Sequence, residues 1–219
     1  MSTKFRAVMF DLDGTLLDTI DDLTDAMNAA LRACGLPARS AAECKYFVGD
    51  GVRNYALRAM PEDRRDEATL AKVVQLYVEA YRKNWDRKTR PYEGIADLLD
   101  ALVARGLSIV VYSNKPDDFT HLTVTKLLPK WKFAAVVGAR EGVPNKPDPS
   151  AAIAIAAKLG ISTSQFVYVG DTNTDMKTAN GAGMFPVGAL WGFRTAEELL
   201  ANGAKALIEK PIELLRVIE

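Results

Sequence analysis

The stretch FRAVMFDLDGT, residues 5–15, decides how this chain folds. Residues 5–10 form a short apolar run, which is typical of a buried β-strand. The run ends at Asp11, and Asp13 and Gly14 follow directly. The stretch therefore predicts a first strand and, immediately after it, a pair of carboxylates that could do chemistry.

The pattern after this strand is helical for about seventy residues and then alternates. Residues 18–34 have helical spacing, and no strand signal interrupts the chain before residue 86. Apolar runs typical of strands then alternate with helical segments; they lie at residues 107–112, 134–137, 166–169 and 185–190. This alternation predicts an α/β fold with a Rossmann-like parallel sheet core, residues 1–16 and 91–219, and a small helical domain, residues 17–90, inserted after the first strand.

Composition narrows the functional classes. The 219 residues carry 28 basic and 28 acidic side chains, so the basic excess typical of nucleic-acid-binding proteins is missing. No stretch is apolar enough or long enough to suggest a membrane partner. The two cysteines, Cys34 and Cys44, do not make a disulfide framework, and the cytoplasm is the expected location. Composition leaves open whether the protein is a monomer or a homodimer.

Polar residues follow each of the first four predicted strands. Asp11 and Asp13 follow the first, and Ser113-Asn114-Lys115 follow the second. The third leads into residues 145–149, NKPDP, and the fourth into residues 170–175, GDTNTD. Because parallel α/β sheets bind ligands beyond the carboxyl ends of their strands, these four segments are expected to meet in one site.

The acidic residues of these segments predict a metal. Asp11, Asp13, Asp171 and Asp175 would repel one another, so a cation is expected among them. Oxygen ligands of this kind favour Mg²⁺. Lys146 supplies a further positive charge that could keep a nucleophilic carboxylate ionised and neutralise phosphate oxygens.

The remaining groups suggest phosphate chemistry. The hydroxyl of Ser113, the amide of Asn114 and the backbone N–H groups of Gly14-Thr15 would together resemble a phosphate cradle. A carboxylate such as Asp11 can attack phosphorus, and Asp13, two residues later, could exchange a proton with the leaving oxygen and then with water.

At this point the chain resembles the haloacid dehalogenase superfamily. It carries all four motifs of that superfamily, FDLDGTLLDT (10–19), YSNK (112–115), NKPDP (145–149) and GDTNTD (170–175). Two further segments, FVGDGVRNYALRAM (47–60) and VGALWGF (187–193), resemble its phosphoglycolate phosphatase-like branch.

The resemblance implies a role for each matching residue. Asp11 would form a phosphoaspartyl intermediate, and Asp13 would be the general acid and base. Mg²⁺ would be held by Asp11, the backbone carbonyl of Asp13 and Asp171, with Asp175 supporting the metal site from outside. The groups that would hold the transferring phosphoryl group are Ser113, Asn114 and Lys146.

Two basic residues remain open at this stage. The resemblance makes residues 17–90 a cap domain, and our hypothesis is that its loop Gly49-Asp50-Gly51 closes over the site so that Arg53 meets a substrate anion. The alternative is that Arg53 is a solvated helix residue. Lys115 is expected to be a phosphate-side cation or, alternatively, structural.

The function that these expectations favour is Mg²⁺-dependent hydrolysis of a small phosphorylated metabolite, with 2-phosphoglycolate as the first guess. One alternative is a phosphomutase of the β-phosphoglucomutase type, which shares the four motifs. The other is a non-catalytic binding protein on the same fold. His121 is expected to be structural or exposed, and Trp191 and Phe193 to pack near the fourth motif.

Overall fold

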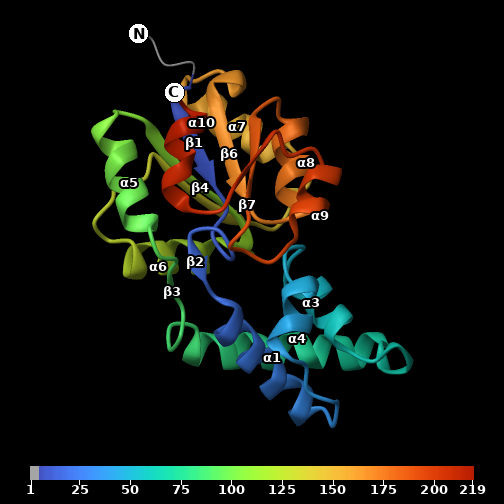
Figure 1. The fold of residues 1–219 in the computed structure, drawn as a ribbon. Helices are drawn as coiled ribbons and strands as arrows, with labels where there is room; N and C mark the ends of the chain where they lie inside the picture. Colours follow the sequence, from blue (N-terminus) through green and yellow to red (C-terminus); the bar gives the residue numbers. More distant parts are fainter. Residues whose placement is uncertain (1–4) are drawn as a thin grey trace. The chain divides into compact units, whose positions relative to one another are not determined.

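The structure is a computed structural model that describes residues 5–219. The chain divides into two compact units, one formed by Met1–Leu17 with Pro91–Glu219 and the other by Asp18–Arg90. It passes between them at two short strands, β2 (Leu17–Asp18) and β3 (Arg90–Pro91), which pair with each other (Figure 1). The sequence did not predict this pairing.

A parallel sheet forms the centre of the larger unit. Its strand order is β5-β4-β1-β6-β7-β8, and every neighbouring pair is parallel. The strands are β1 (Ala7–Phe10), β4 (Ser108–Pro116), β5 (Ala135–Ala139), β6 (Phe166–Gly170), β7 (Phe185–Ala189) and β8 (Ala206–Ile208). The expected Rossmann-like α/β fold is confirmed. Because the chain proceeds from β1 outward to β5 and then restarts on the other side at β6, the strand order reverses at β1.

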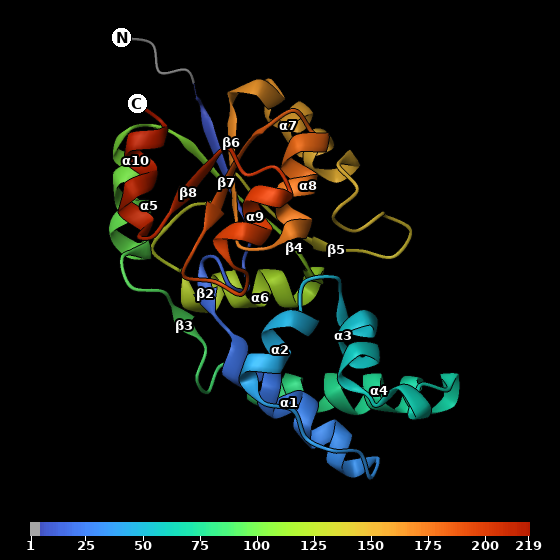
Figure 2. The same cartoon turned by 45° about the vertical axis from the view of Figure 1, so that its right-hand side comes forward.

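Helices cover both faces of this sheet, as Figure 2 shows. The helices of the larger unit are α5 (Ile95–Ala104), α6 (Asp117–Leu127), α7 (Ser150–Leu159), α8 (Asn173–Gly181), α9 (Ala196–Ala201) and α10 (Leu214–Val217), with 3₁₀ turns at Thr163–Gln165 and Pro211–Glu213. Helices α5, α6 and α10 contribute to the hydrophobic core on one face, and α7 and α8 to the core on the other.

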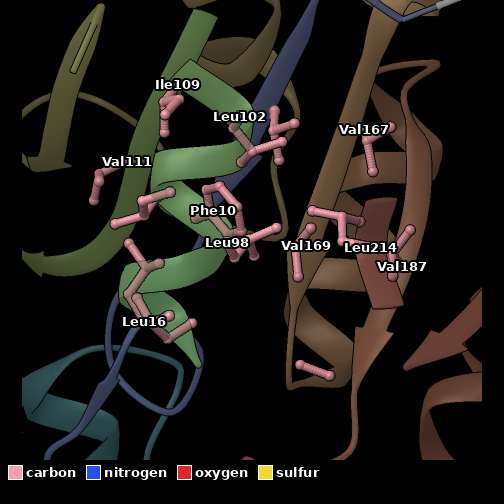
Figure 3. Close-up of a cluster of buried hydrophobic side chains, with 14 of the residues drawn as sticks. Phe10, Leu16, Leu98, Leu102, Ile109, Val111, Val167, Val169, Val187 and Leu214 are labelled. Atoms are coloured by element: carbon pink, nitrogen blue, oxygen red, sulfur yellow. The ribbon is translucent and has the colours of Figure 1, made fainter. Parts of the chain in front are cut away.

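Strand β1 is buried on both of its sides, which explains its unbroken apolar sequence. Val8 and Phe10 belong to the core on the α5 side, whereas Ala7 and Met9 belong to the core on the α7 side. Figure 3 shows Phe10 packed near Leu98 of α5. This two-sided packing fixes the register of β1, and with it the place where Asp11 leaves the sheet.

The smaller unit is helical. It contains α1 (Ile20–Ala33), α2 (Ala41–Phe47), α3 (Val52–Ala59) and α4 (Glu67–Asn84), with a 3₁₀ turn at Glu62–Arg64. Ser40 begins α2 with a capping box that involves Glu43. The buried Asp22 accepts hydrogen bonds from the backbone of Lys88 and from both the backbone and the hydroxyl of Thr89, which ties α1 to the returning chain.

One strand extends beyond its predicted end, and side-chain caps set the start of two helices. Strand β4 continues through Ser113-Asn114-Lys115, which were expected to follow it, and its register with β5 shifts within this stretch. Helix α4 begins at Glu67, because Asp66 caps it and residues 62–64 form the 3₁₀ turn. Helix α8 begins at Asn173, because Thr172 and Asp175 form its capping box. Among the described residues, none of the helices combines the length and apolarity needed to cross a bilayer.

The packing of α5 against the sheet predicts a large difference between two positions of this helix. Leu98 is fully buried, and Val103 is 52% exposed. We expect Leu98→Ala to lower the free energy of unfolding by about 2–5 kcal/mol, since it leaves a cavity in the core. Val103→Ala, the matched control, should change it by less than about 1 kcal/mol. Urea titration followed by circular dichroism measures both, and equal effects would contradict the assigned packing.

Candidate active site

The residues expected to carry chemistry meet at the carboxyl end of the sheet, where the strand order reverses. Asp11 follows β1 directly, and its backbone N–H donates to the carbonyl of Val169 in β6 at 3.0 Å. Its side chain is only 10% exposed. Asp11 is therefore positioned by the strand ladder itself rather than by a loop.

Lys146 lies between two of the acidic residues. Its Nζ is 2.9 Å from Oδ1 of Asp11 and 2.7 Å from Oδ1 of Asp175, and it also donates to the carbonyl of Tyr112 at 3.3 Å. Its side chain is 2% exposed. A buried ammonium ion needs such partners, because its desolvation would otherwise be very costly.

Asn114 positions the backbone of Lys146. Its Nδ2 donates to the carbonyl of Lys146 at 3.0 Å, and its Oδ1 accepts the N–H of Lys146 at 2.9 Å. The side-chain amide of Asn114, in strand β4, thus holds the loop that contains Lys146 against that strand. Sequence reasoning assigned Asn114 to a phosphate cradle and did not foresee this contact.

Three carboxylates come together in a group that could hold a metal. Asp11, Asp171 and Asp175 each offer an oxygen, and these oxygens all lie within 4.8 Å of one another. Oδ1 of Asp11 is buried, and its contact in the described part of the chain is the ammonium group of Lys146 at 2.9 Å. With Asp13 included, the site contains four carboxylates, and its two ammonium groups belong to Lys115 and Lys146. Four negative and two positive charges leave a formal excess of two negative charges. This donor set and this charge fit a divalent cation such as Mg²⁺.

Asp171 is held from two sides. Its Oδ1 accepts a hydrogen bond from the hydroxyl of Thr15 at 2.8 Å, and its Oδ2 accepts one from the backbone N–H of Phe193 at 2.9 Å. Gly14 has φ +89°, and a Cβ at this position would overlap the carboxylate of Asp171. The glycine is therefore needed both for the turn and for the close approach of Asp171.

The backbone N–H groups of the turn after Asp13 form hydrogen bonds within the turn. The N–H of Gly14 donates to the carbonyl of Leu17 at 2.9 Å, and that of Thr15 donates to the carbonyl of Leu12 at 3.4 Å. These two N–H groups, expected in a phosphate cradle, therefore close the turn. The contact that the turn makes with the acidic group comes from the side chain of Thr15.

Asp175 is fixed at the start of α8. Its Oδ2 accepts hydrogen bonds from the N–H and the hydroxyl of Thr172, at 3.0 and 2.6 Å, and the hydroxyl of Tyr168 reaches its Oδ1 at 3.4 Å. A Cβ at Gly170 would overlap its side chain. Asp175 is thus a member of the acidic group and, through Oδ1, a partner of Lys146.

Asp13 and Lys115 form a second ion pair. Nζ of Lys115 lies 3.0 and 3.1 Å from the two carboxylate oxygens of Asp13. The Lys115 side chain is 4% exposed and that of Asp13 is 14% exposed. The hydroxyl of Ser113, in the same strand, accepts the N–H of Lys115 at 3.3 Å, and its proton stays available for another acceptor.

Arg53 lies in the helical unit, near the start of α3. Its guanidinium forms hydrogen bonds of 2.9 and 2.6 Å with both carboxylate oxygens of Glu67, and its side chain is 60% exposed. Asp50, in the loop before α3, pairs with Arg58. The hypothesis that Arg53 meets a substrate anion stays a prediction, and Glu67 would compete for the same guanidinium.

Burial sets the protonation of the acidic group. Desolvation, opposed by Lys146 and reinforced by Asp175, raises the pKa of Asp11 to about 7. Desolvation, together with Asp175 and Asp11, also holds the pKa of Asp171 well above its ordinary value. Burial works to lower the pKa of Lys146, but Asp11 and Asp175 outweigh it and raise this pKa. A bound divalent cation would reverse the shifts of the carboxyl groups.

Two tyrosines of the site were not foreseen. Nζ of Lys146 lies 5.6 Å from the ring centre of Tyr112 and 6.0 Å from that of Tyr168, so the lysine is placed against two aromatic faces. Both residues stand in strands on the α7 side of the sheet. Both tyrosines lie within apolar runs, so the sequence pattern assigned them to the strands. A tyrosine near the carboxyl end of a buried strand could nevertheless have indicated a residue of the site. His121 is exposed and 3.9 Å from Asp117, as expected.

The family model of haloacid dehalogenase-like hydrolases matches residues 8–189. The chain belongs to the haloacid dehalogenase-like hydrolase family. That range includes all four strand ends and the helical unit between them, so the resemblance stated from the motifs is confirmed.

Phosphatases are among the proteins that this chain resembles over nearly its full length. It is 32% identical over 210 residues to a phosphoglycolate phosphatase of Xanthomonas campestris pv. campestris (strain 8004), with 95% of this chain and 94% of the relative covered. The crystal structure of a phosphoglycolate phosphatase candidate from Lactobacillus delbrueckii subsp. bulgaricus superposes with a TM-score of 0.93 at 30% identity, covering 98% of each chain. The expectation of a phosphoric monoester hydrolase is confirmed.

A third similarity concerns the fold alone. A β-phosphoglucomutase candidate from Thermotoga maritima superposes with a TM-score of 0.76 at 21% identity, covering 97% of this chain and 98% of that one. This similarity concerns the architecture and carries no information about the reaction.

The environment of Asp11 predicts an unusual titration. In the metal-free protein, we expect its carboxyl group to lose its proton near pH 7. Lys146→Met should raise this pKa further, because it removes the ammonium group that stabilises the carboxylate. Mg²⁺ should lower it. Carboxyl ¹³C NMR of the metal-free protein measures the pKa, and Lys158→Met, an exposed position on α7, is the control that should leave it unchanged. A pKa below 5 without metal would contradict the expected burial.

Proposed function

We propose that this protein is a Mg²⁺-dependent phosphatase that hydrolyses a small phosphomonoester through a phosphoaspartyl intermediate on Asp11. The observation that carries the proposal is the position of Asp11: its carboxylate lies at the strand reversal, beside the ammonium group of Lys146 and within the acidic group. A nucleophile for phosphorus needs to be ionised and to have cations beside it, because both it and the phosphate are negative.

The first half of the reaction transfers the phosphoryl group to the protein. An oxygen of Asp11 attacks phosphorus, and the bond between phosphorus and the ester oxygen breaks. Asp13 gives its proton to the departing oxygen, which leaves as an alcohol. Lys146 and the hydroxyl of Ser113 would stabilise the charge on the other phosphoryl oxygens.

The second half restores Asp11. Asp13, now a carboxylate, takes a proton from water, and the water oxygen attacks the phosphorus of the phosphoaspartyl group. The bond between phosphorus and the Asp11 oxygen breaks, and inorganic phosphate leaves. The ion pair with Lys115 fixes the position of the Asp13 side chain, which lies outside the group of Asp11, Asp171 and Asp175.

Mg²⁺ would be held by Asp11, the backbone carbonyl of Asp13 and Asp171, with Asp175 holding Lys146 and closing the group behind them. When bound, the ion would neutralise the carboxylates and the phosphate oxygens and keep Asp11 ionised. The close approach of the three carboxylates and the formal excess of two negative charges support this assignment.

For the substrate, 2-phosphoglycolate is the first candidate. The support is the 32% identity to a phosphoglycolate phosphatase over nearly the full length of both chains. The cytoplasmic location and the choice between monomer and homodimer stay predictions. A panel of phosphorylated metabolites assayed with Mg²⁺ tests the substrate. If sugar phosphates alone are hydrolysed, the candidate substrate is wrong while the mechanism stands.

The alternative is a phosphomutase of the β-phosphoglucomutase type, which would return the phosphoryl group to a sugar rather than to water. The assay that separates the two is release of inorganic phosphate in the absence of a bisphosphate activator. Release at a steady rate supports a phosphatase. Phosphate release that requires the activator, or isomerised sugar phosphate in its place, would support the mutase. A binding protein without activity would release none.

Replacement of one carboxylate oxygen of Asp11 by an amide nitrogen tests whether this residue is the nucleophile. Asp11→Asn should lower kcat for an aryl phosphate by roughly 10³-fold or more, because the nucleophile is removed while the shape of the site is kept. Asp100→Asn, at an exposed carboxylate that pairs with Lys130, is the control that should keep full activity. Activity retained in Asp11→Asn would exclude this residue as the nucleophile.

The metal assignment makes a separate prediction. Removal of divalent cations by a chelator should abolish turnover, and Mg²⁺ should restore it. Asp171→Asn should weaken Mg²⁺ binding by roughly 10-fold or more, since one charged ligand is lost. Calorimetric titration of the metal-free protein measures the affinity without reference to the substrate. Unchanged affinity in Asp171→Asn would place the ion elsewhere.

A further inference from the structure

The segment Trp191-Gly192-Phe193, directly beyond β7, contacts two different parts of the acidic site. The backbone N–H of Phe193 donates to Oδ2 of Asp171 at 2.9 Å. The indole N–H of Trp191 donates to the carbonyl of Thr15 at 2.9 Å. Among the four motifs of the family resemblance, none includes this segment.

These contacts close a ring of hydrogen bonds across three strand ends. Thr15, after β1, donates its hydroxyl to Oδ1 of Asp171, which follows β6. Asp171 accepts from Phe193, and Trp191 of the same segment returns to the carbonyl of Thr15. Each carboxylate oxygen of Asp171 is thereby fixed by one donor, and each retains further capacity as an acceptor.

Gly192 completes this arrangement by its lack of a side chain. A Cβ at this position would overlap Cβ of Asp171 and would lie 2.5 Å from its Oδ2. Gly192 is not among the glycines with positive φ, so an alanine here meets no backbone restriction. The need for glycine is therefore one of space, and the space belongs to the side chain of Asp171.

We propose that Trp191, Gly192 and Phe193 are positioning residues that fix the direction of the Asp171 carboxylate and thereby set the affinity of the site for its divalent cation. The inference rests on the proposed function, in which Asp171 is a metal ligand. Carboxylates that bind metals gain affinity when hydrogen bonds hold their orientation, because less conformational freedom is lost on binding.

The inference is tested by Mg²⁺ titration of the full-length metal-free protein. Trp191→Phe removes one N–H and retains an aromatic ring, and should weaken Mg²⁺ binding roughly 10-fold. Gly192→Ala displaces the Asp171 side chain and should weaken it roughly 100-fold. Trp131→Phe is the matched control, because the indole N–H of Trp131 donates to the surface residue Asp100. It should leave the affinity unchanged.

Kinetics separate positioning from a general structural role. In Trp191→Phe, kcat at saturating Mg²⁺ should return to near the wild-type value, while the Mg²⁺ concentration for half-maximal activity stays raised. The melting temperature of the metal-free variant should stay close to that of the wild type. A low kcat at every Mg²⁺ concentration, or wild-type affinity in both Trp191→Phe and Gly192→Ala, would overturn the inference.

Mg²⁺ titration of Asp171→Asn shows whether a negative result concerns only the positioning role or the proposed metal site itself. If Asp171→Asn weakens Mg²⁺ binding and the two segment variants do not, the metal site stands and only the positioning role is wrong. If Asp171→Asn has no effect either, the metal assignment itself fails.

Discussion

The buried ammonium group of Lys146, between Asp11 and Asp175, is the contact on which the rest of the site depends. Burial disfavours the charges of Asp11 and Lys146, and the two carboxylates would repel each other without the lysine. The surrounding structure serves this group: Asn114 holds the backbone of Lys146, and two tyrosine rings flank its side chain. Loss of this one charge would leave buried carboxylates that only protons or a metal ion could neutralise.

Each member of the acidic group is fixed by a different kind of local structure. Asp11 is held by the strand ladder, Asp171 by donors from two segments, and Asp175 by the first turn of α8. All three supports converge where the strand order reverses, because only there do neighbouring connections leave the sheet on opposite sides. The fold thus supplies rigidity from several elements at a single point, and the catalytic proposal draws on that rigidity.

Most of the fold and the identity of the acidic group could be predicted from the sequence. Unbroken apolar runs such as Ala7–Phe10 identify buried parallel strands, and polar residues at their ends identify the site. Three features could not be predicted, since they depend on contacts far apart in the chain. These are the use of Asn114 to bind Lys146, the hydrogen bond from Phe193 to Asp171, and the extension of β4 through residues 113–116. Neither spacing nor composition specifies which distant group a side chain will meet.

The pairing of β2 with β3 has a consequence for how this protein could be rebuilt. Because the helical unit leaves and rejoins the larger unit through two strands that are hydrogen-bonded to each other, its ends lie side by side. An insertion of this kind can be exchanged for a longer, shorter or unrelated segment without altering the register of the sheet. The catalytic scaffold and the part of the chain that follows Leu17 are therefore separable modules, and a graft at Asp18 and Arg90 would leave every residue of the acidic group in its own element.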